Sequence, residues 1–179
     1  MHSSSRATSE VGICIDGRDL RRSLGAFPTG ICLVTTVGAQ GKREGMTINS
    51  FASLSLNPPL VLWSVRSAAQ SAPNFLSSRH FIVSVLSSDQ KDLALHFARP
   101  ALDKFAAFES SFDTGLGGCP RLKNPVSTFE CLYHSAHEEG DHSVIIGKIE
   151  RFSSSGLSPL VFHSGKIGTL HEHASGVAN

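Results

Sequence analysis

The spacing of short β-branched runs constrains the fold of this chain more than any other feature of its sequence. These runs are bounded by turn residues, for example Gly38-Ala-Gln-Gly41 and Asn57-Pro58-Pro59, which is the pattern of strands joined by tight turns. The run 60–65 (LVLWSV) predicts a central, buried strand, and two runs around Gly140 predict a long hairpin. The strands predicted in this way cover 31–37, 46–56, 60–65, 80–86, 126–137, 143–152 and 160–163.

Three short helices are predicted between the strands. The spacing of Leu20, Leu24 and Phe27 predicts a helix over 19–27. A second helix is expected to begin near Ser71 as N-cap, and a third to follow the capping-box pattern at 87–90 and to end before Pro100. Because strands dominate and are mostly joined by turns, we expect a mainly β fold with short helices, a barrel rather than a doubly wound parallel sheet. Segment 115–125 is expected to be a loop.

The length and the ends of the chain predict a single domain. A chain of 179 residues is long enough to bury one core, and no internal repeat or shift in composition divides it. We expect a disordered N-terminal tail over 1–15, one domain over 16–172 and a C-terminal tail over 173–179. The start lacks the apolar stretch of a signal peptide, and no apolar run approaches the roughly 20 residues that span a bilayer. The expectation is therefore a cytoplasmic protein without a membrane segment.

Charge and cysteine usage argue against several classes of function. Sixteen Lys and Arg residues balance fifteen Asp and Glu residues, so no charge excess indicates a nucleic-acid or anionic membrane partner. The four cysteines are far apart and form no CxxC pair, which argues against a zinc site and a disulfide framework and favours a reducing compartment. His134 and His137 would face opposite sides of a strand, so no metal site is expected.

The common nucleotide-binding and hydrolase motifs are missing from the sequence. The glycines at 115–118 lie in a predicted loop and do not complete a GxGxxG pattern, and there is no GxxxxGK[ST], GxSxG or HExxH. Dinucleotide binding of the usual glycine-loop type and P-loop chemistry are therefore not expected.

Three segments contain residues that suit cofactor chemistry. The stretch 46–53 (MTINSFAS) is rich in small neutral polar side chains, which suit the edge of a planar heterocycle and the oxygens of a phosphate; the alternative is a polar strand face in water. Ser71 at a helix N-terminus would favour an anion such as phosphate, or simply cap the helix. Lys104-Phe105 would add a cation and an apolar wall, or a surface Lys beside a core Phe.

His142 follows the turn pair Gly140-Asp141 at the start of a predicted strand. Its imidazole titrates near neutral pH and can donate to a carboxamide or a phosphate. The alternative is a solvated turn residue.

Taken in order along the chain, these segments resemble the short-chain flavin reductases, the reductase components of two-component flavin-dependent aromatic monooxygenases. The resemblance runs from about Leu20 to Leu170. It is carried by LGAFPTG at 24–30, GMTINSFASLS at 45–55, Pro58-Pro59-Leu60, Lys104-Phe105, Gly140-Asp141-His142 with Gly147, and PLVF at 159–162 with Gly165.

This resemblance implies an FMN-binding split β-barrel of Greek-key type, usually a homodimer with flavin sites at or near the interface. It implies hydride transfer from NADH, or less favourably NADPH, to FAD or FMN, and supply of the reduced flavin to a separate monooxygenase, commonly one that hydroxylates phenols. The lack of an obvious Arg cluster for a 2′-phosphate favours NADH. The alternatives are a split-barrel oxidase that keeps its flavin and a non-catalytic flavin- or haem-binding module.

The resemblance also implies roles for individual residues. His142 is associated with the nicotinamide, and Ser71 takes the place of a phosphate-binding hydroxyl. The chain departs from the family pattern at 67–71 (SAAQS), before the second helix, and at Ile167, where an aromatic residue is common. The residues expected around the flavin are Thr29, Thr47, Ile48, Asn49, Ser50, Ser53, Ser64, Val65, Ser71, Lys104 and Phe105.

Overall fold

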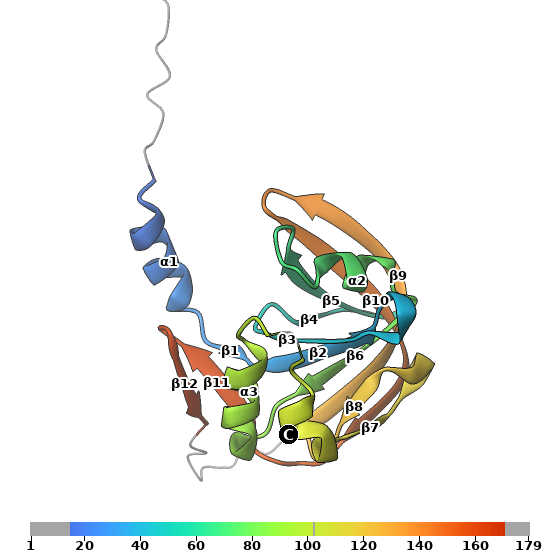
Figure 1. The fold of residues 1–179 in the computed structure, drawn as a ribbon. Helices are drawn as coiled ribbons and strands as arrows, with labels where there is room; N and C mark the ends of the chain where they lie inside the picture. The colour runs from blue at the N-terminus through green and yellow to red at the C-terminus, as the bar shows by residue number, and fades with distance from the viewer. Residues whose placement is uncertain (1–14, 102, 171–179) are drawn as a thin grey trace, which may run out of the picture.

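The computed structural model describes residues 15–101 and 103–170, and its main element is a seven-stranded antiparallel sheet (Figure 1). Apart from residue 15, the predicted tails lie outside the described residues, and so does the predicted domain boundary at 171–172. The strands follow the order β3-β2-β6-β9-β10-β5-β4. Their bounds are β2 Cys32–Val37, β3 Arg43–Ile48, β4 Ala52–Leu56, β5 Pro59–Arg66, β6 His80–Val85, β9 Ser127–Glu139 and β10 His142–Ser154.

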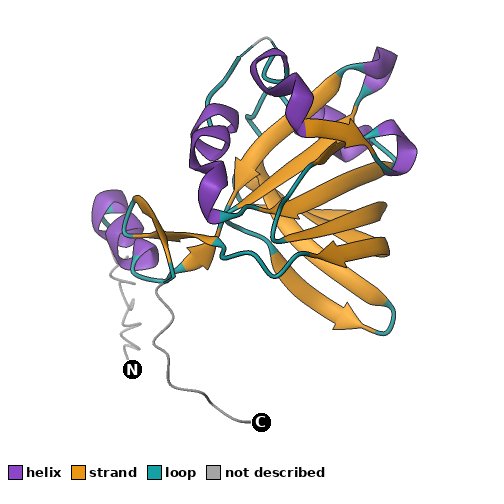
Figure 2. Ribbon diagram, turned by 90° about the horizontal axis from the view of Figure 1, so that it is seen from below, coloured by secondary structure: helices purple, strands orange, loops and turns teal. Residues whose placement is uncertain are grey.

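The sheet curls into an open barrel because its two edge strands are consecutive in the chain. Three residues, 49–51, join β3 to β4. Four Cα steps span at most about 14 Å, whereas the edges of a flat seven-stranded sheet would lie about 29 Å apart, at about 4.8 Å per strand spacing. The ends of β3 and β4 must therefore approach each other, and Figures 1 and 2 show the sheet wrapped around a common interior. The predicted mainly β barrel is confirmed.

The order of the strands is that of a Greek key rather than a simple meander. The hairpins β2-β3 and β4-β5 form the two ends of the sheet, and the later strands β6, β9 and β10 fill the middle. The predicted long hairpin is confirmed as β9 and β10. The run 60–65, predicted as a central, buried strand, is an interior strand, because β5 pairs with both β10 and β4. It lies second from the edge of the sheet and buries alternate residues on one face only, Val61, Trp63 and Val65.

Two cores stabilise the molecule. The first core fills the barrel interior and includes Trp63, whose indole makes edge-to-face contacts with Phe75 and Phe81. The second core lies under the helix α3 (Lys91–Phe97), where Phe97 packs against Phe105. The short helix η2 (Ser88–Gln90) precedes α3, which ends before Pro100 as predicted.

Two small sheets were not fully anticipated. The segment expected to be a loop contains η4 (Leu116–Gly118) and β8 (Pro120–Leu122), which pairs with β7 (Phe112–Thr114). A third sheet combines β1 (Thr29–Gly30), β11 (Leu160–His163) and β12 (Lys166–Thr169). Strands of two to four residues are too short to establish a period, so the sequence predicted β11 but neither of its partners. The remaining 3₁₀ helices are η1 (Ala39–Gly41) and η3 (Ala106–Ser111).

The helix α1 (Gly17–Gly25) stands away from the barrel (Figure 1), capped by Asp16, whose carboxylate accepts from the Arg18 and Asp19 amides at 2.7 and 3.2 Å. Helix α1 begins and ends two residues earlier than the predicted helix over 19–27. The apolar side chains that predicted the helix are exposed among the described residues: Leu20, Leu24 and Phe27 are 45%, 66% and 75% exposed.

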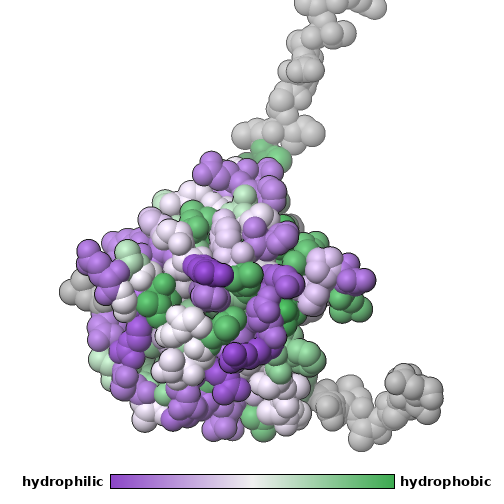
Figure 3. Space-filling view, turned by 90° about the vertical axis from the view of Figure 1, so that its right-hand side faces the viewer, coloured by the Kyte–Doolittle hydropathy of each residue, from purple (hydrophilic) through white to green (hydrophobic). Residues whose placement is uncertain are grey.

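The described surface is otherwise mixed. On the face shown in Figure 3, apolar side chains lie in small groups among polar ones. Among the described helices, none is both long and apolar enough to cross a membrane. The described residues also contain no cluster of three or more His, Cys, Asp or Glu side chains that could hold a metal ion.

Candidate functional site

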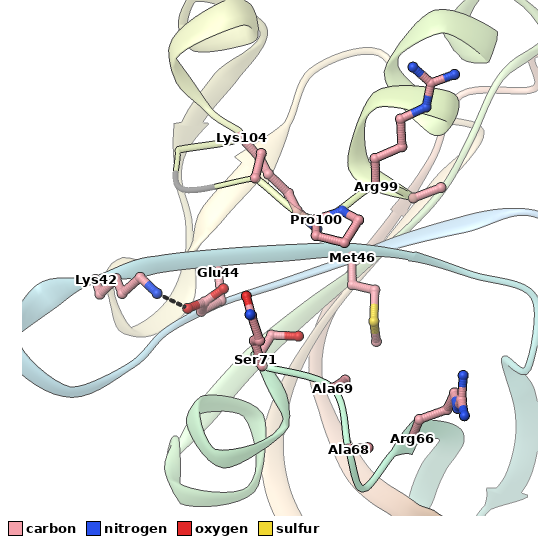
Figure 4. A pocket seen from close by; sticks show the side chains of 13 residues that line it. Lys42, Glu44, Met46, Arg66, Ala68, Ala69, Ser71, Arg99, Pro100 and Lys104 are labelled. Atoms are coloured by element: carbon pink, nitrogen blue, oxygen red, sulfur yellow. Dashed lines mark ion pairs between the residues drawn. The ribbon is translucent and has the colours of Figure 1, made fainter.

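A pocket of about 450 Å³ lies between two loops that are far apart in the sequence (Figure 4). One wall is the loop between β5 and α2 (Ala72–Ser77), and the other is the segment that follows α3. The first residues of β3 contribute the third side. The lining residues are Lys42, Glu44, Met46, Arg66, Ala68, Ala69, Gln70, Ser71, Ala98, Arg99, Pro100, Ala101 and Lys104.

Positive charge dominates the pocket lining. Lys42 forms an ion pair with Glu44 at 2.7 Å, and Glu44 is the one carboxylate among the lining side chains. Within the described residues, no carboxylate lies within ion-pair distance of Arg66, Arg99 or Lys104. A concave site with surplus cations attracts an anionic ligand such as a phosphate.

Lys104 fixes the position of the segment after α3. Its ammonium donates to the carbonyl oxygens of Gly45 and Phe97, both at 3.0 Å, and thereby ties this segment to β3 and to the end of α3. Burial lowers the pKa of Lys104, while the charge of Glu44 acts in the opposite direction. Because an ammonium has three N–H donors, one remains for a ligand in the pocket.

Ser71 occupies the predicted N-cap position of α2 and faces the pocket. Its side chain makes no capping hydrogen bond, and the helix that follows has six residues. Ser71 is thus the N-cap residue, as predicted, but its hydroxyl does not cap the helix as the alternative reading required, and so short a helix provides little dipole. The hydroxyl of Ser71 remains available to a ligand.

His142 lies next to the pocket rather than in its lining. It is the first residue of β10 and pairs with Arg66 at the end of β5. Its Nδ1 donates to the Asp141 carboxylate at 2.7 Å, and this hydrogen bond lowers the pKa of Asp141. The backbone N–H of Ser67 donates to the Asp141 carbonyl at 3.0 Å, so the turn at 140–142 is bonded directly to one pocket wall.

The predicted flavin stretch divides into structural and exposed residues. The Thr47 hydroxyl donates to the Ala94 carbonyl at 2.7 Å and attaches β3 to α3. The Ser50 hydroxyl accepts from the Ser64 N–H at 3.0 Å and thereby joins the β3–β4 connection to β5. Asn49, in the connection between β3 and β4, and Ser53, on the edge strand β4, are exposed.

The remaining predicted residues lie outside the pocket lining. Ile48 and Val65 are buried in the barrel core, and Phe105 is buried in the second core. Thr29 lies on β1, and its hydroxyl is buried with no hydrogen-bond partner among the described residues. Of the predicted residues, the structure thus brings Ser71 and Lys104 together in the pocket.

The sequence reasoning missed most of the charged lining. Arg66 directly follows the apolar run 60–65, and a charged residue at the end of a predicted strand could have been proposed as a site residue. Lys42, Glu44 and Arg99 lie on separate segments and follow no periodic pattern, so the sequence contains no comparable sign that they meet.

Comparison with known families gives a match over nearly the whole described chain. The model of the family described as "Flavin reductase like domain" matches residues 24–171. The chain belongs to this family. The open barrel is accordingly the flavin reductase-like fold, as the resemblance of the motifs implied.

Three relatives in this family are particularly informative. The stachydrine N-demethylase reductase subunit Stc3 of Rhizobium meliloti (strain 1021) is 39% identical over 150 residues, which cover 84% of this chain and 64% of that protein. The FMN reductase (NADH) SmoA of Agrobacterium fabrum is 39% identical over 154 residues, 86% of each chain. The solved NADH:FAD oxidoreductase SgcE6 of Streptomyces globisporus, in complex with NAD and FAD fragments, has a TM-score of 0.80 at 34% identity and covers 90% of this chain and 99% of its own.

The coverage differs among these relatives. The chain spans 49% and 64% of the length of two curated relatives from Rhizobium meliloti.

Proposed function

We propose that this protein is an NADH-dependent flavin reductase that transfers hydride to FMN or FAD and supplies the reduced flavin to a separate monooxygenase. Membership of the flavin reductase-like family and the names of the three relatives support this proposal. The main structural support in this chain is the pocket, in which the Ser71 hydroxyl and three cationic side chains, Lys104, Arg66 and Arg99, line the same cavity.

The residues of this pocket fit a phosphate-bearing flavin. The cavity volume of about 450 Å³ lies within the range of roughly 300 to 1,000 Å³ that is usual for ligand sites. The lining has four cations and one carboxylate, which suits a phosphate. Thr29 lies outside this lining, but its buried hydroxyl has no partner among the described residues, which supports the proposal that Thr29 lies near another part of the flavin.

In this proposal a bound flavin supplies the hydride acceptor, and the protein supplies binding and orientation. Arg66, Arg99 and Lys104 bind the phosphate, and the Ser71 hydroxyl donates to it. The exposed side chains of Asn49 and Ser53, with Ser50 and Ser64 at the adjacent strand end, bind the remainder of the cofactor.

His142 orients the nicotinamide. Its hydrogen bond to Asp141 holds one ring nitrogen, which leaves Nε2 to face a carboxamide or a phosphate. Hydride transfer requires the two cofactors to be stacked, so its rate depends mainly on positioning. We therefore assign His142 an orienting role and not that of an obligatory proton donor.

We further propose that the protein is a homodimer and that its monooxygenase partner receives the flavin by diffusion. The unpacked face of α1 supports the dimer, as do Leu56 on edge strand β4 and Phe152 on β10, which are 93% and 77% exposed. The buried centre of a homodimer interface is more apolar than the rest of a protein surface, so large exposed apolar side chains favour such an interface.

A steady-state assay that crosses NADH and NADPH with added FMN and FAD tests the proposed activity. We expect purified protein to be colourless and to oxidise NADH when FMN or FAD is added. Retention of a yellow flavin through purification would instead indicate the oxidase alternative. Failure to oxidise either nicotinamide with excess FMN and FAD would refute the reductase.

A further inference from the structure

One carboxylate lies in a pocket whose other charged side chains are cations. Glu44 is on β3, and its side chain is 12% exposed. Lys42 contacts the carboxylate at 2.7 Å, and the Asn74 amide donates to it at 2.8 Å. Asn74 is itself packed against Gly38, where an added Cβ would overlap its side chain. Glu44 is therefore held in a fixed position at the pocket wall.

The two contacts of Glu44 do not explain its presence in an anion site. A carboxylate at the wall of a phosphate site repels the phosphate, and it also offsets the cations that attract it. A pocket that had only to retain a phosphate tightly would bind better with a neutral side chain at this position. The amide of Asn74 would still find an acceptor oxygen on a glutamine, so the carboxylate charge is not needed for that hydrogen bond.

We propose that Glu44 is an affinity-limiting residue: its charge weakens binding of the flavin phosphate, so that flavin exchanges instead of remaining bound. This inference rests on the proposed reductase function and assigns its cofactor to the class of exchangeable substrates. Arg66, Arg99 and Lys104 attract the phosphate, while Glu44 and its partner Lys42 set how strongly it is held.

The test compares two ligands that differ in the phosphate alone, FMN and riboflavin, by fluorescence titration of the oxidised ligands in the absence of nicotinamide. In Glu44→Gln we expect FMN to bind roughly three- to tenfold more tightly than to the wild type, because one negative charge near a phosphate is removed. Riboflavin affinity should stay the same. The gain for FMN should shrink at high salt, because added ions screen the charge.

Two further variants make the test specific. Lys42→Gln leaves Glu44 without its ion-pair partner, and we expect FMN affinity to fall while riboflavin affinity is unchanged. Glu150→Gln removes an equal charge from an ion pair on β10, Lys148–Glu150 at 3.1 Å, which does not line the pocket. FMN affinity in this control should equal that of the wild type.

The outcomes separate this inference from the proposed function. If the wild type bound FMN no more tightly than riboflavin, the phosphate site itself would be refuted. If the wild type preferred FMN but Glu44→Gln kept the same FMN-to-riboflavin ratio, the affinity-limiting role alone would be wrong. An equal change in both ligands would also overturn it, because Glu44 would then act on the ring or the ribityl chain.

Discussion

Replacement of Gly45 by alanine should disturb the junction between β3 and α3 on which the pocket depends. Gly45 is buried on β3, and its carbonyl accepts one of the two hydrogen bonds of Lys104. A Cβ at this position would lie 2.7 and 2.8 Å from two ring carbons of Phe97 and 3.1 Å from the ring of Phe105. Contacts of this length force at least one ring to move.

The rings have little room to move. Phe97 is fully buried and makes edge-to-face contacts with Phe105 at 5.1 Å and with Phe112 at 5.8 Å between ring centroids. Overpacking of a tight core costs about 1–3 kcal/mol. For a domain of this size, a loss of about 2 kcal/mol lowers the melting temperature by roughly 4–8 °C. We expect Gly45→Ala to lower the free energy of unfolding by about 2 kcal/mol. FMN binding should also weaken, because the carbonyl of residue 45, which accepts from Lys104, shifts.

Urea and thermal denaturation of Gly45→Ala, Phe97→Leu and the double variant measure the effect. Phe97→Leu removes the ring edge that the new methyl group meets, so the double variant should be more stable than the sum of the single effects predicts, by about 1 kcal/mol. Additive effects would refute the steric reasoning. A Gly45→Ala variant with wild-type stability would show that the β3–α3 junction accommodates a methyl group.

The remaining predictions concern a hydrogen bond, a thiol and the turn histidine. Thr47→Val removes the hydroxyl bonded to the Ala94 carbonyl and should lower the free energy of unfolding by about 0.5–1.5 kcal/mol in urea titrations. Burial raises the pKa of Cys32 from 9.0 to about 12. Between pH 9 and 12 the folded state therefore binds more protons at Cys32 than the unfolded state does. The free energy of unfolding is unaffected by this thiol below pH 9 and falls between pH 9 and 12, by at most about 1.4 kcal/mol per pH unit. Cys32→Ala should flatten the measured decline, and an unchanged slope would contradict the assignment. His142→Ala should raise the Michaelis constant for NADH with FMN affinity unchanged, and Asp141→Asn should have a smaller effect; steady-state kinetics with wild-type constants would exclude the orienting role.

Local patterns predicted the barrel because its strands and turns are encoded by neighbouring residues. The β-branched run that forms β2, the turn before β3 and the apolar runs around Gly140 each specify structure within a few residues. The helix α3 was equally accessible, since its apolar spacing and the following Pro100 are local signals. The order of the strands was not predicted: the run at 60–65 indicated an interior strand, but its place between β10 and β4 depends on long-range pairing that no local pattern records.

The pocket was predicted only in part, because local motifs indicate single residues but not which distant residues lie together. Ser71 and Lys104 could be proposed from motifs, but their proximity results from the barrel, which brings the end of β5 to the segment after α3. Glu44 and Arg99 are separated by more than fifty positions and carry no signal of their own in one sequence. Thr47 illustrates the opposite error, because a hydroxyl in a cofactor-like motif proved to be bonded to the backbone of α3.

The hydrogen bond between Ser67 and Asp141 links the two halves of the proposed reaction. The turn at 140–142 carries His142, and the loop that begins at Ser67 carries part of the pocket lining. His142 is also paired with Arg66 across β10 and β5, so the residue assigned to the nicotinamide and a residue assigned to the flavin phosphate are adjacent on two bonded strands. Because the sheet fixes the separation of these two residues, the proposed roles make the relative position of the two cofactors a consequence of strand register. A reductase that relies on positioning needs this kind of rigid connection between its two binding sites.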